Sequence, residues 1–331
     1  MNKVIDIHSH LLPRSAIAAV EAGVDWFGST LATDDLGRPV IVTGDYRVSM
    51  GGKEHYESME QRLERMDGIG VDMQVLSLNP ILFRYYLDPD LAVAAATAVN
   101  DEIAGFVERW PDRFLGFGQL PMQRPDRAVA ELERVMQIPG MVGAALGSHV
   151  LNANWDEPHL FPVLEAAEEL GAVLFFHPAA SRLKDALPRY HMRNYIANPT
   201  ETTIAIGSLI FGGVVDRLPD LKMVFAHGGG YACWASARFD HGYGVRHEAR
   251  EHIGSLPSEY LVRLWYDSLV HGHANLRHLL DVFGTDRIVL GTDYPADMGQ
   301  PDPLAWVAGS GLTDAEQNAV LRDNVAGLLA I

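Results

Sequence analysis

The sequence has 331 residues, of which 48% are hydrophobic, and a formal net charge of −17. This negative charge argues against a nucleic-acid partner, because binding to phosphates needs a basic surface. The single cysteine, Cys233, excludes an internal disulfide. We find neither a secretory leader nor an apolar run of about 18 residues, and we therefore expect a soluble, cytoplasmic protein that is not inserted in a membrane.

The first predicted strand, Val4 to Ile7, continues into the motif His8-Ser9-His10. Because side chains two residues apart on a strand point to the same side, His8 and His10 could hold one metal ion together. Two unrelated surface histidines are the alternative for such a motif on its own. The next section, residues 11–53, contains turn residues and lacks helical periodicity. We interpret it as an insertion between the first strand and the first helix, in the form of a small β-rich flap.

Strands and helices alternate through the rest of the chain. The first helix is predicted at residues 56–69, and a second begins at Asp88-Pro89, an acidic N-cap followed by proline, and runs to Trp110. Further helices are predicted at residues 126–136, from Asp156-Glu157-Pro158 onward, and after a capping box at Thr313–Glu316. The other strands are predicted at residues 71–78, 114–120, 142–146, 172–176, 221–226, 264–266 and 288–291.

Eight strands separated by helices, with no break in composition, predict one α/β domain over residues 1–331, folded as a (β/α)8 TIM barrel with an insertion. The functional groups of this fold lie at the C-terminal ends of the strands. Three later strands are followed there by His177, His227 and Asp293. Each of these could by itself end a strand, start a helix or close a turn, but their common position in a barrel favours an active site.

These residues have the chemistry of a metal site with a proton carrier beside it. A divalent transition metal such as zinc binds imidazole nitrogens and carboxylate oxygens. His227 can act as an acid or a base near neutral pH. The four candidate ligands are His8, His10, His177 and Asp293.

Four motifs carry these residues in chain order: His8-Ser9-His10, Phe176-His177-Pro178, Phe225-Ala226-His227-Gly228-Gly229-Gly230 and Gly291-Thr292-Asp293-Tyr294-Pro295. This order resembles the amidohydrolase superfamily, and the likeness covers nearly the whole chain. It is closer to the decarboxylase branch, the amidohydrolase-2 group typified by 2-amino-3-carboxymuconate-6-semialdehyde decarboxylase. Many relatives that decarboxylate aromatic acids begin with Glu-x-His, so the His-x-His motif favours the carboxymuconate-semialdehyde type.

The resemblance implies a zinc-dependent, non-oxidative decarboxylase of a small unsaturated or aromatic carboxylic acid, in the catabolism of an aromatic compound. It implies one Zn²⁺ ion, with Mn²⁺ or Co²⁺ as alternatives. His8, His10, His177 and Asp293 are then the metal ligands. His227 and Asp293 are the catalytic residues, and His227 activates the metal-bound water and shuttles protons.

The resemblance also implies that arginines bind the carboxylate substrate, some of them from the neighbouring subunit of a homodimer. Arg238 and Arg246 fit this role, and their spacing of eight would place them on roughly the same side of one helix. A further arginine is expected in the insertion, where Arg47 is the closest candidate, although an ungapped comparison places Met50 there. The remaining histidines without motif support are expected in loops or helices: His191, His241, His247, His271 and His273.

Two other functions stay open from the residues alone. One is a metal-dependent hydrolase of an amide, a lactone or a ring C–N or C–O bond, because the same activated water can serve as an acid or as a nucleophile. The other is a metal-binding or regulatory protein without catalysis. His227 disfavours the second, since a purely structural metal does not require it.

Overall fold

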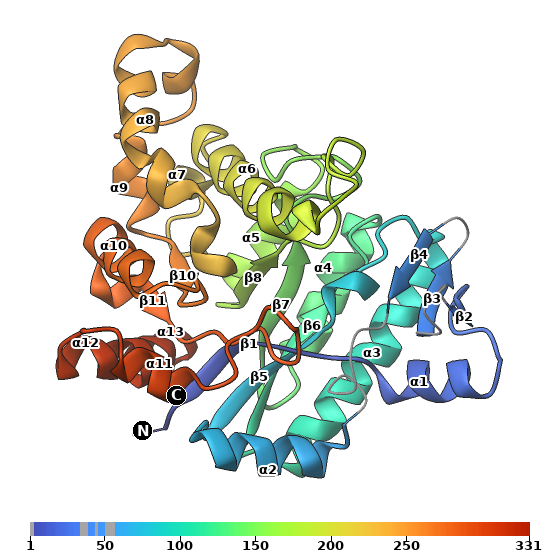
Figure 1. Ribbon diagram of the computed structural model, residues 1–331. Coiled ribbons are helices and arrows are strands. Elements are labelled where there is room, and N and C mark those ends of the chain that lie inside the picture. Colours follow the sequence, from blue (N-terminus) through green and yellow to red (C-terminus); the bar gives the residue numbers. More distant parts are fainter. Residues whose placement is uncertain (1–2, 34–38, 44–45, 50–56) are drawn as a thin grey trace.

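Eight parallel strands form the central sheet, in the order β1-β5-β6-β7-β8-β9-β10-β11. The computed structural model describes residues 3–33, 39–43, 46–49 and 57–331 (Figure 1). The sheet closes into a barrel where β1 meets the chain after Val289: Ile7 N donates to Leu290 O at 3.0 Å and Asp293 N to His8 O at 2.8 Å. The strands are β1 (Ile5–Leu11), β5 (Met73–Leu78), β6 (Phe114–Gln119), β7 (Met141–Gly147), β8 (Val173–His177), β9 (Lys222–Phe225), β10 (Trp265–Asp267) and β11 (Ile288–Val289).

Helices surround this barrel, which confirms the predicted (β/α)8 fold (Figure 1). The far end of α8 projects beyond the other helices at the upper left of Figure 1, while the helix packs against α9 and α10. Within the described ranges, no helix combines the length and the apolar character that crossing a membrane would need. The helices outside the insertion are α2 (Met59–Ile69), α3 (Pro89–Arg109), α4 (Pro125–Val135), α5 (Phe161–Glu169), α6 (Asn198–Phe211), α7 (Val214–Arg217), α8 (Ala232–Val245), α9 (Pro257–Leu261), α10 (His273–Phe283), α11 (Pro303–Ala308), α12 (Asp314–Asn318) and α13 (Asn324–Leu329).

The apolar run of β8 shows how the strands build the core. Successive side chains of a strand point to opposite faces of the sheet. Phe175 stacks on Phe117 with ring centroids 5.7 Å apart and lies against the ring of His8 at 4.9 Å. Phe176, on the other face, stacks on Phe225 at 4.9 Å. The barrel is therefore filled by aromatic rings directly beneath the end of β1 that carries the histidine motif.

Two predicted helix starts are confirmed and one is wrong. Asp88 caps α3 by accepting from the backbone amides of Asp90 and Leu91, and the capping box of Thr313 with Glu316 opens α12. The start predicted at residues 156–158 is too early, because turns occupy that stretch and α5 begins at Phe161. The buried Trp155 donates from Nε1 to Gly147 O at 3.0 Å, which ties these turns to the end of β7.

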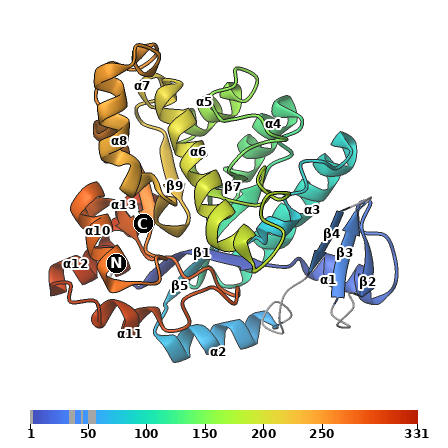
Figure 2. The same ribbon diagram turned by 45° about the horizontal axis from the view of Figure 1, so that its top comes forward.

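The predicted insertion after the first strand is present, and part of it is helical. It contains α1 (Arg14–Glu21) and an antiparallel sheet of β2 (Thr30–Thr33), β3 (Pro39–Thr43) and β4 (Tyr46–Ser49). Sequence analysis missed α1, because a helix of eight residues that buries little more than Ala16 and Ile17 gives too short a stretch for helical periodicity. Figure 2 shows the small sheet and α8 on opposite sides of the barrel.

Candidate metal centre and active site

The structure brings the four candidate metal ligands together. His8 and His10 lie on β1, His177 ends β8, and Asp293 follows β11. One ligand atom of each lies within 4.8 Å of the others, and all four residues are buried. Asp293 Oδ1 is 3.1 Å from His8 Nε2, 3.0 Å from His10 Nε2 and 3.9 Å from His177 Nε2. The three imidazoles therefore converge through their Nε2 atoms on one carboxylate oxygen.

A partner on the other ring nitrogen sets the orientation of each imidazole. His177 Nδ1 lies 2.8 Å from Pro178 O, which can only accept. His10 Nδ1 lies 2.8 Å from Ser77 Oγ, whose own proton goes to Ser9 O at 2.9 Å, so that this oxygen accepts from the ring. His8 Nδ1 lies 2.5 Å from Asp267 Oδ2. With each proton on Nδ1, the three Nε2 lone pairs are free to bind a cation.

The donor set fits one divalent metal ion. Ligands held about 2.0–2.1 Å from a metal lie roughly 2.9–3.4 Å apart, close to most of the separations in this cluster. His177 Nε2 is buried and has no hydrogen-bond partner among the described residues, which a metal bond would supply. Three imidazole nitrogens and one carboxylate oxygen suit a borderline metal ion better than the all-oxygen shells of calcium or magnesium.

The charges of the cluster also suit a cation. Burial by itself raises the pKa of Asp293, but the charge of His8 and the hydrogen bonds from the histidines hold it well below its ordinary value, so this group is a carboxylate. Burial lowers the pKa of His10 to about 4. Burial also acts to lower the pKa of His8, but the charge of Asp293 and the hydrogen bond to Asp267 raise it to about 10. In the metal-free protein near neutral pH, His8 therefore carries a proton on both ring nitrogens, and the proton on Nε2 takes the place of a metal.

His227 lies beside the cluster but is held less firmly than the ligands. Its Nε2 is 3.4 Å from Asp293 Oδ2, and its Nδ1 is buried without a hydrogen-bond partner among the described residues. The residue follows β9 with a φ of 56°, and the backbone stays in the left-handed region through Gly230. A Cβ on Gly230 would lie 2.1 Å from Pro199 O. Close packing, against backbone at Gly230 and against side chains at the two glycines before it, therefore accounts for the glycine run.

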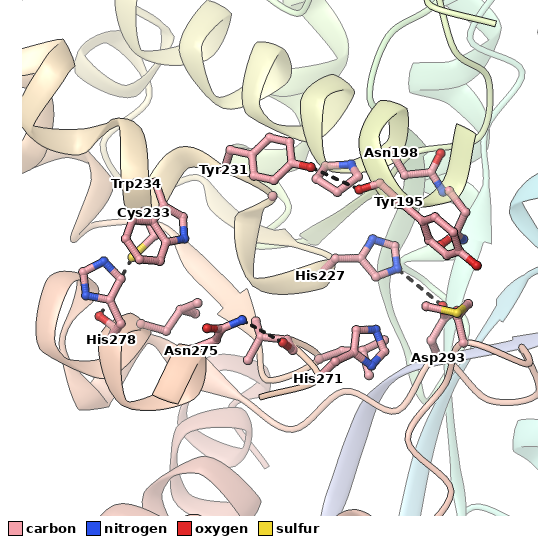
Figure 3. A pocket seen from close by; sticks show the side chains of 17 residues that line it. Tyr195, Asn198, His227, Tyr231, Cys233, Trp234, His271, Asn275, His278 and Asp293 are labelled. Atoms are coloured by element: carbon pink, nitrogen blue, oxygen red, sulfur yellow. Dashed lines mark hydrogen bonds and ion pairs between the residues drawn. The ribbon is translucent and has the colours of Figure 1, made fainter. Parts of the chain in front are cut away.

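A cavity of about 320 Å³ opens beside His227 and Asp293 (Figure 3). Its walls come from the start of α6, the start of α8 and the segment from β10 into α10. No lysine or arginine lines it within the part of the chain that the structure describes. Besides His227 and Asp293, its polar and aromatic lining consists of Asn194, Tyr195, Asn198, Tyr231, Trp234, His271, Asn275 and His278.

The structure does not bring the candidate arginines to this cavity within one chain. Arg238 is exposed on α8. Arg246 is the C-cap residue of that helix, has an extended conformation and pairs with Glu248 at 2.7 Å. The condition that both arginines lie within one helix is therefore not met. Arg47 is exposed on β4, where it donates to Thr33 O at 3.4 Å. Met50 lies outside the described residues.

Asp267, Asp6 and His271 are among the site residues that sequence analysis did not assign. Asp267 holds His8, and a carboxylate at the end of the weak seventh strand was the signal for it. Asp6 lies beneath the cluster and accepts from the backbone amides of His8 at 3.1 Å and Thr292 at 3.0 Å. His271, expected in a loop or a helix, lines the cavity, and only its position just after β10 hinted at this.

A barrel that gathers three histidines and an aspartate at the ends of its strands, beside a cavity, defines a metal-dependent enzyme of the (β/α)8 class. The family model described as amidohydrolase matches residues 5–331. The chain therefore belongs to the amidohydrolase family.

Individual relatives show which members of this family the chain is similar to. The 2-amino-3-carboxymuconate-6-semialdehyde decarboxylase of Dictyostelium discoideum is 36% identical over 303 residues, which cover 90% of this chain and 83% of that protein. The structure of 5-carboxyvanillate decarboxylase from Sphingomonas paucimobilis matches with a TM-score of 0.84 and 25% identity over 100% of both chains. A third match is the structure of a dihydroxybenzoic acid decarboxylase from Polaromonas, with bound manganese and the inhibitor 2-nitroresorcinol. It has a TM-score of 0.81 and 22% identity, and the match covers 100% of this chain and 97% of that chain. At this identity the match shows the shared fold alone. The predicted decarboxylase branch is confirmed.

Proposed function

We propose that the protein is a metal-dependent carboxy-lyase that removes carbon dioxide, without oxidation, from a small unsaturated or aromatic carboxylic acid. The observation that carries this proposal is the position of His227, between a cluster that fits a divalent metal and a cavity of about 320 Å³. The decarboxylases to which the chain is similar support the reaction type.

We propose zinc as the metal, because imidazole nitrogens with one carboxylate are a common zinc donor set. Mn²⁺ and Co²⁺ remain alternatives, since the affinity order of a site does not alone decide which metal it holds in cells. A divalent ion bound there supplies a Lewis acid that polarises oxygen atoms and lowers the pKa of water. Metal analysis of the purified protein, with activity measured after chelation and reloading with each ion, tests the choice.

The protein's own residues supply proton transfer and positioning. Loss of carbon dioxide requires a proton at the carbon that carried the carboxylate, and the electrons of the broken C–C bond form the new C–H bond. His227 lines the cavity, and no residue that the structure describes offers its Nδ1 a hydrogen bond that would fix the tautomer. The ring can therefore hold and release a proton at Nε2. Asp293 keeps that nitrogen directed at the cluster.

We further propose that the active form is a homodimer in which Arg238 completes the site of the other copy. The cavity has no cation of its own among the described residues that line it, apart from histidines. Arg238 makes no ion pair with a described residue, and Trp234, four residues earlier on α8, is 69% exposed at the cavity edge. A guanidinium from a second copy would supply the missing partner for a carboxylate.

Mixing two inactive variants tests this homodimer. If Arg238 acts across the interface, then mixed dimers of His227→Ala and Arg238→Ala contain one intact site. Random exchange of subunits then restores about a quarter of the wild-type activity, because half of the dimers are mixed and each has one working site of two. No recovery after proven exchange, or full activity in a proven monomer, argues against it.

The reaction itself is tested with metal-loaded protein and a panel of unsaturated and aromatic carboxylates, amides and lactones. Carbon dioxide release and incorporation of heavy oxygen from labelled water are followed together. We expect carbon dioxide release without label in the organic product, and its loss in His227→Ala and Asp293→Ala. Label in the product without carbon dioxide would replace the proposal by a hydrolase. Turnover that survives complete metal removal would exclude both.

A further inference from the structure

One buried carboxylate contacts both halves of the site. Asp267 is the last residue of β10 and is fully buried. Its Oδ2 accepts from His8 Nδ1 at 2.5 Å. Its Oδ1 accepts from Gly228 N at 2.9 Å and from Leu269 N at 3.1 Å. Gly228 directly follows His227, and Leu269 lines the cavity.

We infer that Asp267 is a positioning residue that sets the metal-binding tautomer of His8 with one oxygen and holds the turn of His227 with the other. This inference rests on the metal site of the proposed function but not on the identity of the substrate or the reaction.

The contact with His8 differs from those of the other two ligand histidines. Ser77 and Pro178 offer His10 and His177 neutral oxygens, whereas Asp267 is a carboxylate. A carboxylate only accepts, so the proton stays on Nδ1 and the Nε2 lone pair faces the metal position. A charged partner also makes the imidazole a more basic ligand than a neutral one does. His8 should therefore depend on its partner more strongly than His10 depends on Ser77.

The second oxygen holds a backbone that sterics disfavour. His227 has a φ of 56° and Gly228 a φ of 62°, so two successive residues are left-handed. Such a conformation is sterically unfavourable for a residue with a side chain and persists when surrounding contacts hold it. Gly228 N donates to Asp267 directly after the strained residue. This hydrogen bond ties the turn to β10 and so sets where the ring of His227 lies.

The packing leaves room for this arrangement only because residue 291 is a glycine. A Cβ on Gly291 would lie 2.7 Å from Asp267 Cβ and 2.9 Å from His8 Cβ, closer than such atoms approach. The glycine of the Gly291-Thr292-Asp293 motif therefore lets the chain that follows β11 pass between these two side chains. The motif contributes one metal ligand and also the space in which another ligand meets its partner.

Asp267→Asn tests the contact with His8 separately from the contacts with Gly228 and Leu269, because asparagine and aspartate have nearly the same shape. Two amides face Oδ1 and one ring nitrogen faces Oδ2, so the asparagine keeps its oxygen toward Gly228 and Leu269 and turns its NH₂ toward His8. An NH₂ group can only donate, which moves the proton of His8 to Nε2 and blocks metal binding there. Asp267→Ala removes both interactions, and Ser77→Ala removes the neutral partner of His10 as a matched control.

Metal affinity is measured by competition with a chromophoric chelator, and protection of the Gly228 and Leu269 amides by hydrogen exchange. We expect Asp267→Asn to lose about 10–100-fold in metal affinity with both amides still protected. Asp267→Ala should lose affinity and protection together, and Ser77→Ala should lose less affinity than either. Wild-type affinity in Asp267→Asn, or a larger loss in Ser77→Ala, would overturn the role at His8. Unchanged amide protection in Asp267→Ala would overturn the role at His227.

A measurement on protein with Asp267 intact covers the case in which the Asp267 variants do not fold. With ¹⁵N-labelled histidine, the metal-loaded protein should show His8 with a proton on Nδ1 and none on Nε2, assigned by the signal lost in His8→Ala. A proton on Nε2 would refute the inference. None of these readouts needs a substrate, so a failure of the decarboxylase proposal leaves them unaffected and is recognised separately by the absence of carbon dioxide release.

Discussion

Replacing Arg62 by methionine would show how much the network beneath the metal cluster supports it. Arg62 on α2 is buried, and it donates from Nε to Gln74 Oε1 and from Nη1 to His10 O, both at 2.8 Å. Gln74 in turn donates to Asp6 at 2.9 Å, and Asp6 accepts from His8 N at 3.1 Å. The guanidinium therefore supports both histidines of the β1 motif from below.

The expected cost follows from these contacts. Methionine fills much of the same volume but cannot donate, so two buried acceptors, Gln74 Oε1 and His10 O, lose their partner. Each stranded acceptor costs about 1–3 kcal/mol. Burial lowers the pKa of Arg62 to about 10, which reflects the desolvation of its charge, and the apolar replacement recovers part of that penalty. We expect a net loss of about 2–4 kcal/mol in the free energy of unfolding.

Urea unfolding of the metal-free protein measures this loss, and chelator competition measures metal affinity in the same variant. Arg65→Met is the matched control. Arg65 lies one turn further along α2 and stacks on the same Tyr294 ring, but its side chain is 42% exposed and its ion pair with Glu57 is near the surface. Such pairs contribute about 0–1 kcal/mol. If Arg62→Met destabilises no more than Arg65→Met, the reasoning about stranded buried acceptors is refuted.

Three further predictions follow from single contacts. The pKa of His8 is raised to about 10 in the metal-free protein, so metal binding near neutral pH should release about one proton, and the apparent metal affinity should rise about tenfold per pH unit up to about pH 10. Titration calorimetry in buffers of different ionisation heat measures the proton release, and a metal affinity that does not change with pH would contradict the prediction. Gly230→Ala should lower the free energy of unfolding by about 2–4 kcal/mol, because its Cβ would collide with Pro199 O. Gly207→Ala, whose Cβ would have no neighbouring atom within 4 Å, should be neutral or stabilising. Equal melting temperatures of the two variants would argue against this prediction. His271 lines the cavity, so His271→Ala should raise KM without changing metal affinity. The ring of His273 packs on Trp306 instead, so the control His273→Ala should change neither quantity. An unchanged KM in His271→Ala would refute a contact between His271 and the substrate.

The arrangement of strands and ligands could be predicted because it depends on local features of the sequence. An apolar run followed by a polar residue is visible without any partner, and the C-terminal ends of parallel strands meet at one face of a barrel. This reasoning placed His8, His10, His177 and Asp293 at one face, where the structure brings them together. Cap residues such as Asp88 act over a few positions, and α3 accordingly begins where its sequence predicts.

Roles that depend on a distant partner could not be predicted in the same way. Asp267 and His8 are 259 positions apart, and only closure of the barrel brings the carboxylate to the ring. Arg246 lies within a plausible helical spacing of Arg238, yet the helix ends before it. His271 has no motif around it and faces the cavity because the turn after β10 directs it there. The role proposed for Arg238 would depend on a second copy of the chain.

The sequence by itself determined the barrel, the order of its strands and the residue types that can bind a metal, because periodicity, capping and strand ends are encoded over short stretches. Only the tertiary structure decided which nitrogen of each imidazole is available, that a second carboxylate, Asp267, contacts His8, and which side chains face the cavity. Those properties depend on distances of about 3 Å between atoms far apart in the chain, and hydrogen bonding at that range is too directional to follow from spacing along a sequence.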